Sequence, residues 1–209
     1  MKVLIACEFS GIVRDAFIAR GHDAVSCDLL PTERPGPHIQ GDAIEAMQSR
    51  RWDMMIAHPP CTYLTNAGVR HLHEDVSSRL GNRTAIYGAA RYWMMREGGA
   101  FFTALLEALI PRKAIENPIP HGYAVQQIGP HSQVVQPWMF GHGEVKATCF
   151  WLRGLPPLIP THMRNDFFAE QEPSGREQRL HRLPPSKDRA KLRSMTYPGI
   201  AAAMAAQWG

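Results

Sequence analysis

The stretch "KVLIACEFSGIVRDAFIARG", residues 2–21, decides the fold class. Its first six residues form a mostly apolar run, which predicts a buried strand. The next four, "EFSG", predict a tight loop. The apolar residues that follow recur at roughly helical spacing until Gly21, which is a helix stop signal. The stretch therefore predicts a strand, a tight loop and a helix in succession.

The same alternation continues through the first half of the chain. Further strands are predicted at "DAVSCD" (23–28), "WDMMIA" (52–57) and "RKAIENP" (112–118). Helices are predicted at "AIEAMQSRR" (43–51) and within 83–109, with a weak point at Gly98 and Gly99. Alternating strands and helices are typical of an α/β domain with a mostly parallel sheet.

The second half of the chain is less regular. The segments 133–141 and 145–158 each predict a strand, and together they predict an antiparallel addition to the sheet. Residues 156–189 are rich in proline, arginine and histidine without a clear period, which indicates an extended or mobile basic segment. Closing helices are predicted at 188–195 and 200–208.

Length, cysteine content and charge set the limits of the interpretation. The 209 residues suffice for one sizeable core, so we expect a single domain over 1–209. Four scattered cysteines without a CxxC pair argue against a disulfide framework or a metal site and favour a cytoplasmic location. No apolar run approaches the roughly 20 residues of a membrane helix. A net charge of +4 permits a polyanionic partner, and the oligomeric state stays open.

The stretch "MMIAHPPCTYLTNAG", residues 54–68, carries the chemistry. Two prolines end its apolar run because proline donates no ladder hydrogen bond and restricts the residue before it. Cys61 is therefore presented at a strand end. In open α/β sheets the ligand site lies outside the carboxyl ends of the strands. We expect residues 8–11, Asp28, 59–61 and 116–118 to meet at that edge.

The order of these signals resembles the DNA cytosine-5 methyltransferase family. "EFSG" after the first strand, Asp28 after the second, Gly41–Asp42, "PPCTYLTNAG" and "ENP" at 116–118 occur in the family order. The likeness runs to about Asn117 and is most specific at Pro-Cys and Glu-Asn. The length and the general character of the sequence resemble those of the short methyltransferase-like proteins of phages and prophages. The resemblance implies a class I S-adenosylmethionine-dependent methyltransferase (Rossmann-like) sheet with helices on both faces.

The resemblance also implies roles for individual residues. A thiolate at Cys61 would add to carbon 6 of cytosine, and a protonated Glu116 would relieve the charge at N3. Asn117 would tie the Cys61 loop in place, and Lys146 stands roughly where the family has an arginine. The S-adenosylmethionine site would comprise Phe9, Ser10, Gly11, Asp28, Asp42 and Pro59. The substrate contacts would be Thr65, Gly68, Arg176, Arg179 and Arg182.

Two departures from the family keep alternatives open. Val13 stands where the family pattern has its second glycine, and only about sixty residues follow Cys149, too few for a separate target-recognition domain. The partner is expected to be DNA, held chiefly through its phosphates. The alternatives are an enzyme that modifies C5 of a free pyrimidine nucleotide, and a catalytically weak nucleic-acid-binding or decoy protein with the same fold.

Overall fold

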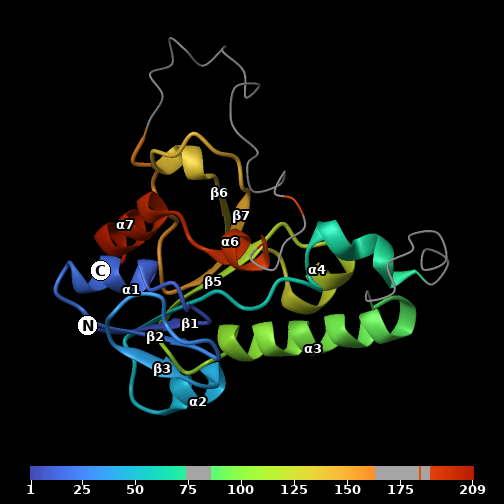
Figure 1. The fold of residues 1–209 in the computed structure, drawn as a ribbon, viewed down its shortest axis with the longest axis horizontal. Coiled ribbons are helices and arrows are strands. Elements are labelled where there is room, and N and C mark those ends of the chain that lie inside the picture. The colour runs from blue at the N-terminus through green and yellow to red at the C-terminus, as the bar shows by residue number, and fades with distance from the viewer. Residues whose placement is uncertain (74–85, 163–183, 185–188) are drawn as a thin grey trace, which may run out of the picture.

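A seven-stranded sheet with helices on both faces forms the protein (Figure 1). The structure is a computed structural model and describes residues 1–73, 86–162, 184 and 189–209. The strands are β1 (Lys2–Ala6), β2 (Asp23–Asp28), β3 (His38–Gln40), β4 (Met54–Ala57), β5 (Arg112–Pro118), β6 (Gln133–Val135) and β7 (Thr148–Arg153). The α-helices are α1 (Ile12–Ile18), α2 (Ala43–Gln48), α3 (Gly88–Leu106), α4 (Gly122–Ile128), α6 (Arg189–Ser194) and α7 (Pro198–Gln207).

The strand order is β3-β2-β1-β4-β5-β7-β6. Strands β1 to β5 pair in parallel, whereas β7 is antiparallel to both of its neighbours, β5 and β6. The predicted α/β fold, with a mostly parallel Rossmann-like sheet and an antiparallel addition, is therefore confirmed. Because the carboxyl ends of parallel strands share one edge, this topology brings the loops after β1, β2, β4 and β5 together.

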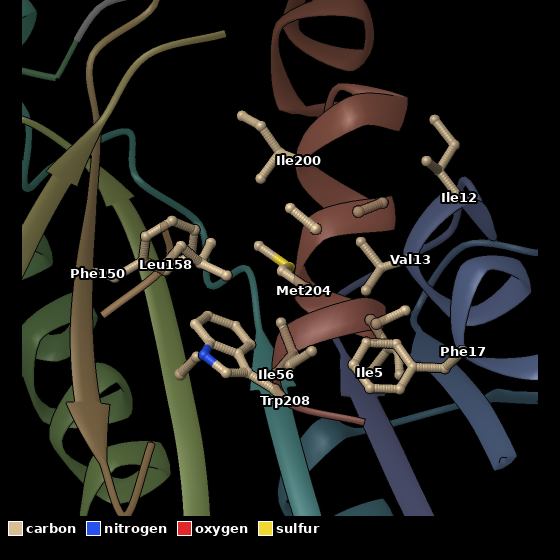
Figure 2. Packing of buried hydrophobic residues seen from close by; sticks show 14 of the residues in the cluster. Ile5, Ile12, Val13, Phe17, Ile56, Phe150, Leu158, Ile200, Met204 and Trp208 are labelled. Carbon is tan, nitrogen blue, oxygen red and sulfur yellow. The ribbon is translucent and has the colours of Figure 1, made fainter. Parts of the chain in front are cut away.

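Both faces of the sheet are buried, which explains why the central strands β1 and β4 are nearly continuous apolar runs. Val3 and Ile5 face the layer formed by α1 and α7, where Phe17 and Met204 complete the packing (Figure 2). Leu4 belongs to the opposite cluster, together with residues of α2, α3 and α4. Successive side chains of β1 thus serve different layers, as the two-residue period of a strand requires.

Two segments differ from their predictions. Residues 133–141 are not one strand, because β6 ends at Val135 and a 3₁₀ helix, η3 (Pro137–Phe140), follows; Pro137 cannot donate to a ladder. Helix α3 runs unbroken through the glycines at which a weak point was expected. A Cβ at Gly99 would overlap the amide of Gln127, so this glycine lets α4 approach α3 closely.

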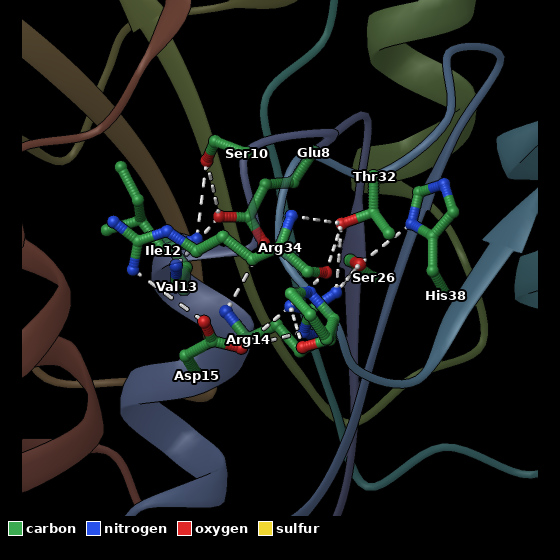
Figure 3. A network of polar contacts seen from close by, with 11 residues as sticks. Glu8, Ser10, Ile12, Val13, Arg14, Asp15, Ser26, Thr32, Arg34 and His38 are labelled. Carbon is green, nitrogen blue, oxygen red and sulfur yellow. Dashed lines mark hydrogen bonds and ion pairs between the residues drawn. The ribbon is translucent and has the colours of Figure 1, made fainter.

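A fully buried arginine of α1 organises the loop between β2 and β3 (Figure 3). The Arg14 guanidinium donates to the hydroxyls of Ser26 (3.2 Å) and Thr32 (3.1 Å). It also donates to the carbonyls of Arg34 (3.1 Å) and Pro35 (3.2 Å) and pairs with the Asp15 carboxylate at 2.8 Å. This one side chain fixes residues 32–35, which begin just past the carboxyl end of β2.

We expect Arg14→Met to lower the free energy of unfolding by about 2–3 kcal/mol, because it leaves buried acceptors without a donor. The measurement is urea unfolding followed by circular dichroism. Arg20→Met is the matched control, since Arg20 is exposed at the end of the same helix; its effect should stay within about 0.5 kcal/mol. Equal effects of the two substitutions would contradict the structural role of Arg14.

No helix in the described ranges is long and apolar enough to cross a membrane. Among the same residues, no three histidine, cysteine, aspartate or glutamate side chains are grouped so as to hold a metal ion.

Candidate active site

The loop that carries Cys61 leaves the sheet between two parallel neighbours. The His58 N–H donates to the Ala6 carbonyl at 3.0 Å, which extends the β1–β4 ladder by one residue. Pro59 is buried, Pro60 is exposed, and the side chain of Cys61 is half-buried after them. The two prolines therefore end the strand and place the thiol just beyond the carboxyl edge, where the sequence predicted it.

Burial and nearby charges decide the ionisation of Cys61. Burial raises the pKa of its thiol, and the Glu116 carboxylate raises it further. The positive charges of Lys146 and Arg193 act in the opposite direction without reversing the shift. The thiol is therefore protonated in the free protein at neutral pH, and the thiolate predicted for the reaction has to form from it. Additional positive charge or a base is needed to ionise it.

The other three cysteines lie in less favourable surroundings for a nucleophile. Burial and the charge of Asp28 raise the pKa of Cys7 to about 12. Burial is also the main reason why the pKa values of Cys27 and Cys149 rise to about 11. No positively charged side chain contributes to the pKa shifts of these three cysteines. Among the four cysteines, only Cys61 has a pKa that neighbouring positive charges lower.

Glu116 follows Ile115, the β5 residue opposite Ala57, so it lies beside the end of β4. Its Oε2 is 3.2 Å from Nδ1 of His58, and the side chains are only 14% and 6% exposed, respectively. Burial alone would raise the pKa of Glu116, but the hydrogen bond from His58 and the charge of Lys146 bring it below its ordinary value. Glu116 is therefore a carboxylate in the free protein, and the proton predicted for its role as an acid has to be taken up before the reaction.

The expected tie between Asn117 and the Cys61 loop takes another form. Asn117 is fully buried, and its Nδ2 donates to the carbonyl of Pro118 at 2.6 Å. The loop is instead held by His121. Its ring Nε2 donates to the Tyr63 carbonyl at 3.0 Å, and its backbone N–H donates to the Leu64 carbonyl at 3.0 Å. Because Nδ1 of His121 accepts from a backbone N–H of α4, Nε2 carries the proton.

Lys146 closes the site from the segment before β7. Its Nζ donates to the Met195 carbonyl at 3.3 Å, and it lies 5.9 Å from the Tyr197 ring. The Tyr197 hydroxyl donates to Glu144 at 2.8 Å, so two bonds join the chain near residue 145 to the segment before α7. A narrow cavity remains, lined by His58, Glu116, Lys146, Thr148, Phe150, Thr196, Tyr197, Ile200 and Met204.

The loop after β1 is closed by its own carboxylate (Figure 3). Glu8 accepts hydrogen bonds from the N–H groups of Val13 (2.7 Å) and Arg14 (3.2 Å) and from the Ser10 hydroxyl (3.1 Å). Gly11 adopts a left-handed conformation at the turn into α1, with φ of 72°. Val13, which replaces the family's second glycine, is fully buried in the core. The backbone N–H groups of Val13 and Arg14, at the start of α1, thus already donate to Glu8.

Phe9 lies under α6. Its ring is 5.7 Å from Nζ of Lys191, which also pairs with the Glu33 carboxylate, and the Glu33 N–H donates to the Phe9 carbonyl at 2.9 Å. The first loop, the β2–β3 loop and the closing helix α6 therefore meet at Phe9. This contact places Phe9 beside the carboxyl edge, as predicted for a residue that lines a ligand site there.

Asp28 and Asp42 give the other side of the edge a negative charge. Asp28 ends β2 and accepts from the Leu30 N–H at 2.9 Å through Oδ1. Asp42 is the N-cap of α2 and accepts from two backbone N–H groups, also through Oδ1. Both carboxylates raise the pKa of Cys7, so both lie near the end of β1. Cys7 itself has the unusual φ of 57°.

The predicted substrate contacts have mixed outcomes. Thr65 is half-buried and forms an isolated bridge with Pro120. Gly68 lies in the 3₁₀ helix η1 (Asn66–Leu72), and a Cβ there would overlap the guanidinium of Arg91, so this glycine packs against protein. Three predicted contacts lie outside the described residues: Arg176, Arg179 and Arg182.

Sequence reasoning missed three residues that shape the site: Arg14, His58 and His121. It placed Glu8 at the edge without assigning it a role. His58 carried a usable signal, since it is a titratable residue at a predicted strand end. The roles of Glu8, Arg14 and His121 depend on partners that only the folded chain brings near.

No family model and no curated protein matches the chain. One solved structure that does match is a candidate DNA modification methyltransferase encoded within a prophage of E. coli. The match has 13% sequence identity and a TM-score of 0.44, and it covers 78% of this chain and 52% of the other. The chain thus spans about half of the length of that structure.

Proposed function

We propose that this protein is an S-adenosylmethionine-dependent methyltransferase that acts on C5 of cytosine in DNA through a covalent bond to Cys61. The observation that carries the proposal is the meeting of Cys61 and Glu116 at neighbouring strand ends, close enough for the carboxylate to raise the pKa of the thiol. A nucleophile beside a carboxyl group is the pair of functions that this reaction needs.

The chemistry explains the need for both groups. C5 of cytosine is a poor nucleophile until a thiolate adds to C6 and turns the ring into an enamine. The addition places negative charge on the ring, which a proton at N3 relieves. Cys61 supplies the sulfur, and Glu116 faces N3. Lys146, whose charge acts on both residues, stabilises the thiolate as it forms.

The choice of cofactor is supported by the charges at the carboxyl edge. Rossmann-like folds that bind dinucleotides hold a pyrophosphate at the start of the first helix. Here Glu8 occupies those donors, and a second anion beside its carboxylate would be repelled. Asp28 and Asp42 instead favour a ligand that carries positive charge and hydroxyl donors. S-adenosylmethionine has both, and it supplies the electrophilic methyl group.

The cofactor would be held by the residues that the sequence assigned to it. Asp28 would accept from the ribose hydroxyls and Asp42 from the adenine amino group, each through the oxygen not used in its turn or cap. Phe9, Ser10 and Gly11 would contact the amino-acid part. Pro59 would close the pocket beside the Cys61 loop.

We expect Asp28→Ala to weaken binding of S-adenosylmethionine by about 1–3 kcal/mol, because the hydroxyl donors lose a charged acceptor. Titration calorimetry measures this change. Cys61→Ala is the control and should bind nearly as well as the unaltered protein, since Cys61 faces the base. Unchanged binding by Asp28→Ala would remove Asp28 from the cofactor site.

DNA is proposed as the substrate because the opposite side of the site is basic. Lys146 and Arg193 both act on Cys61. The sequence 175–193 is rich in arginine and lysine, but most of it lies outside the described residues. Phosphate contacts of this kind hold a backbone without reading its sequence. The target base must leave the stack to reach the thiol. The cavity beside Glu116 has a volume of only about 10 Å³, so Thr196 and Tyr197 must shift to admit a base.

The function is tested by incubating the protein with methyl-labelled S-adenosylmethionine and, separately, duplex DNA, single-stranded DNA, RNA and dCMP. Label is expected in 5-methylcytosine from DNA. Label in dCMP alone would make the protein a nucleotide-modifying enzyme. Cofactor binding without transfer to any of the four substrates would contradict catalysis, and nucleic-acid binding without cofactor binding would favour the decoy function.

A further inference from the structure

A buried histidine–glutamate pair lies in the cavity behind Cys61. Nδ1 of His58 is 3.2 Å from Oε2 of Glu116, and the His58 side chain is only 6% exposed. Its other ring nitrogen, Nε2, is buried and has no hydrogen-bond partner among the described residues. Both residues line the cavity. A buried imidazole with one paired nitrogen and one unsatisfied nitrogen requires an explanation.

We propose that His58 and Glu116 share one proton and that this pair, rather than Glu116 alone, protonates N3 of the target cytosine. This inference rests on the proposed function and deepens it. Glu116 is the catalytic residue that touches the base. His58 acts through Glu116 and is therefore a positioning residue that also stores the proton.

The proton balance requires the histidine. As a carboxylate, Glu116 has no proton to give, and the hydrogen bond from His58 and the charge of Lys146 favour that form against the effect of burial. An imidazolium at His58 carries a proton on each ring nitrogen, and the one on Nδ1 lies directly against Oε2. If that proton moves to the carboxylate, the pair becomes a neutral acid and a neutral imidazole. The pair then holds the same number of protons but can donate one to a ring nitrogen.

The addition step needs no further reactant. The Cys61 thiolate forms the S–C6 bond, the C5–C6 π electrons move into the ring, and N3 receives the proton from the pair. His58 is left neutral, with its remaining proton on Nε2. After methyl transfer to C5, N3 returns its proton to the pair. A solvent water then takes the proton from C5, the electrons of that C–H bond form the C5–C6 double bond again, and the S–C6 bond breaks so that Cys61 leaves as a thiolate.

Several charged or titratable groups face the pair. Lys146, before β7, lies on the same cavity and opposes a second positive charge on His58. Cys149 of β7 and Cys61 both respond to the charge of Glu116. Formation of the Cys61 thiolate adds a negative charge beside the pair, which favours the imidazolium. The nucleophile and the stored proton are therefore expected to appear together.

The first test uses the rate of methyl transfer to DNA as a function of pH. The wild-type rate should fall at alkaline pH, as the pair loses its shared proton. His58→Gln should lower the maximal rate by about 10²-fold or more and remove that alkaline decline, since general acid catalysis contributes about 10²–10⁴-fold. His73→Gln, a substitution of an exposed histidine, is the matched control and should leave the profile unchanged.

A lower rate in His58→Gln with the alkaline decline intact would assign His58 a merely structural role and overturn the proposal. A wild-type rate in this variant would overturn it as well. The calorimetric affinity for S-adenosylmethionine should not change in His58→Gln.

The second test does not depend on activity. Nitrogen-15 NMR of the full chain should find both ring nitrogens of His58 protonated in the wild type at neutral pH and only one of them protonated in Glu116→Gln, because the amide no longer stabilises the imidazolium. A single protonated ring nitrogen in the wild type, or the same protonation state in both proteins, would overturn the proposal. If the wild type transferred no methyl group to cytosine, the proposed function would fail, and this NMR result would still decide whether the pair shares a proton.

Discussion

Cys61→Ser is expected to abolish methyl transfer to DNA. The pKa of a hydroxyl lies far above that of a free thiol, so the ionised fraction at neutral pH falls by many orders of magnitude. The surroundings of Cys61 already raise its pKa, and the same surroundings would also oppose ionisation of a serine hydroxyl. The measurement is single-turnover incorporation of labelled methyl groups.

Two controls separate chemistry from folding in this experiment. Cys27→Ser alters a buried thiol whose hydrogen bond to the Gly41 carbonyl a hydroxyl can reproduce, so activity should persist. Cys61→Ser should still bind S-adenosylmethionine in calorimetry. Methyl transfer at the normal rate by Cys61→Ser would show that another group is the nucleophile.

Glu116→Gln is expected to have opposite effects on catalysis and on the reactivity of Cys61. Methyl transfer should slow by about 10²–10⁴-fold, the usual contribution of general acid catalysis, because an amide cannot deliver a proton to N3. The negative charge of Glu116 raises the pKa of Cys61, so its removal lowers that pKa and increases the thiolate fraction at neutral pH. Alkylation of Cys61 by iodoacetamide should therefore become faster.

The combination of slower catalysis and faster alkylation is difficult to obtain by misfolding. Glu107→Gln is the control, since Glu107 is exposed at the end of α3 and should change neither rate. The direction of this pKa shift also predicts the pH dependence of alkylation. In Glu116→Gln, the alkylation rate should begin to rise at a lower pH than in the wild type. Slower alkylation in this variant would contradict the proximity of the two side chains.

The parallel strands could be predicted because burial on both faces leaves a local signal. The continuous apolar runs are those of β1 and β4, whereas β2 and β5 span the predicted residues, 23–28 and 112–118, with polar residues among the buried ones. By contrast, β3 and α4 have no such signal and were missed. β3 has only three residues, none of them fully buried, and α4 begins at a glycine after a histidine cap.

The edge at which Cys61 and Glu116 meet could be predicted for a related reason. The order of strands along the chain and the rule for carboxyl ends suffice to bring the loops to one side. The pairing of His58 with Glu116 depends in addition on the register of β4 against β5, which joins residues 58 positions apart. The direction of the pKa shift of Glu116 depends on that pairing, which leaves no local signal in the sequence.

The loop after β1 illustrates a second limit. The family resemblance drew attention to Val13, because a glycine is expected at its position. The residue that determines the shape of this loop is Glu8, whose carboxylate accepts a hydrogen bond from the Val13 N–H. Its carboxylate satisfies the start of α1, and Arg14 then ties α1 to the loop after β2. Local propensity contains no information about either contact, because each forms only after the chain has turned through Gly11.

The covalent bond between Cys61 and the base is the central claim. After methyl transfer, the substituent at C5 must leave as a proton before the bond to sulfur can break, and fluorine cannot leave in that way. An oligonucleotide that contains 5-fluorocytosine should therefore become attached to the protein when S-adenosylmethionine is present. We predict that mass spectrometry of the digested complex will find the modified base on the peptide that contains Cys61. Attachment to Cys7, Cys27 or Cys149, or methylation of ordinary cytosine without any trapped complex, would contradict the claim.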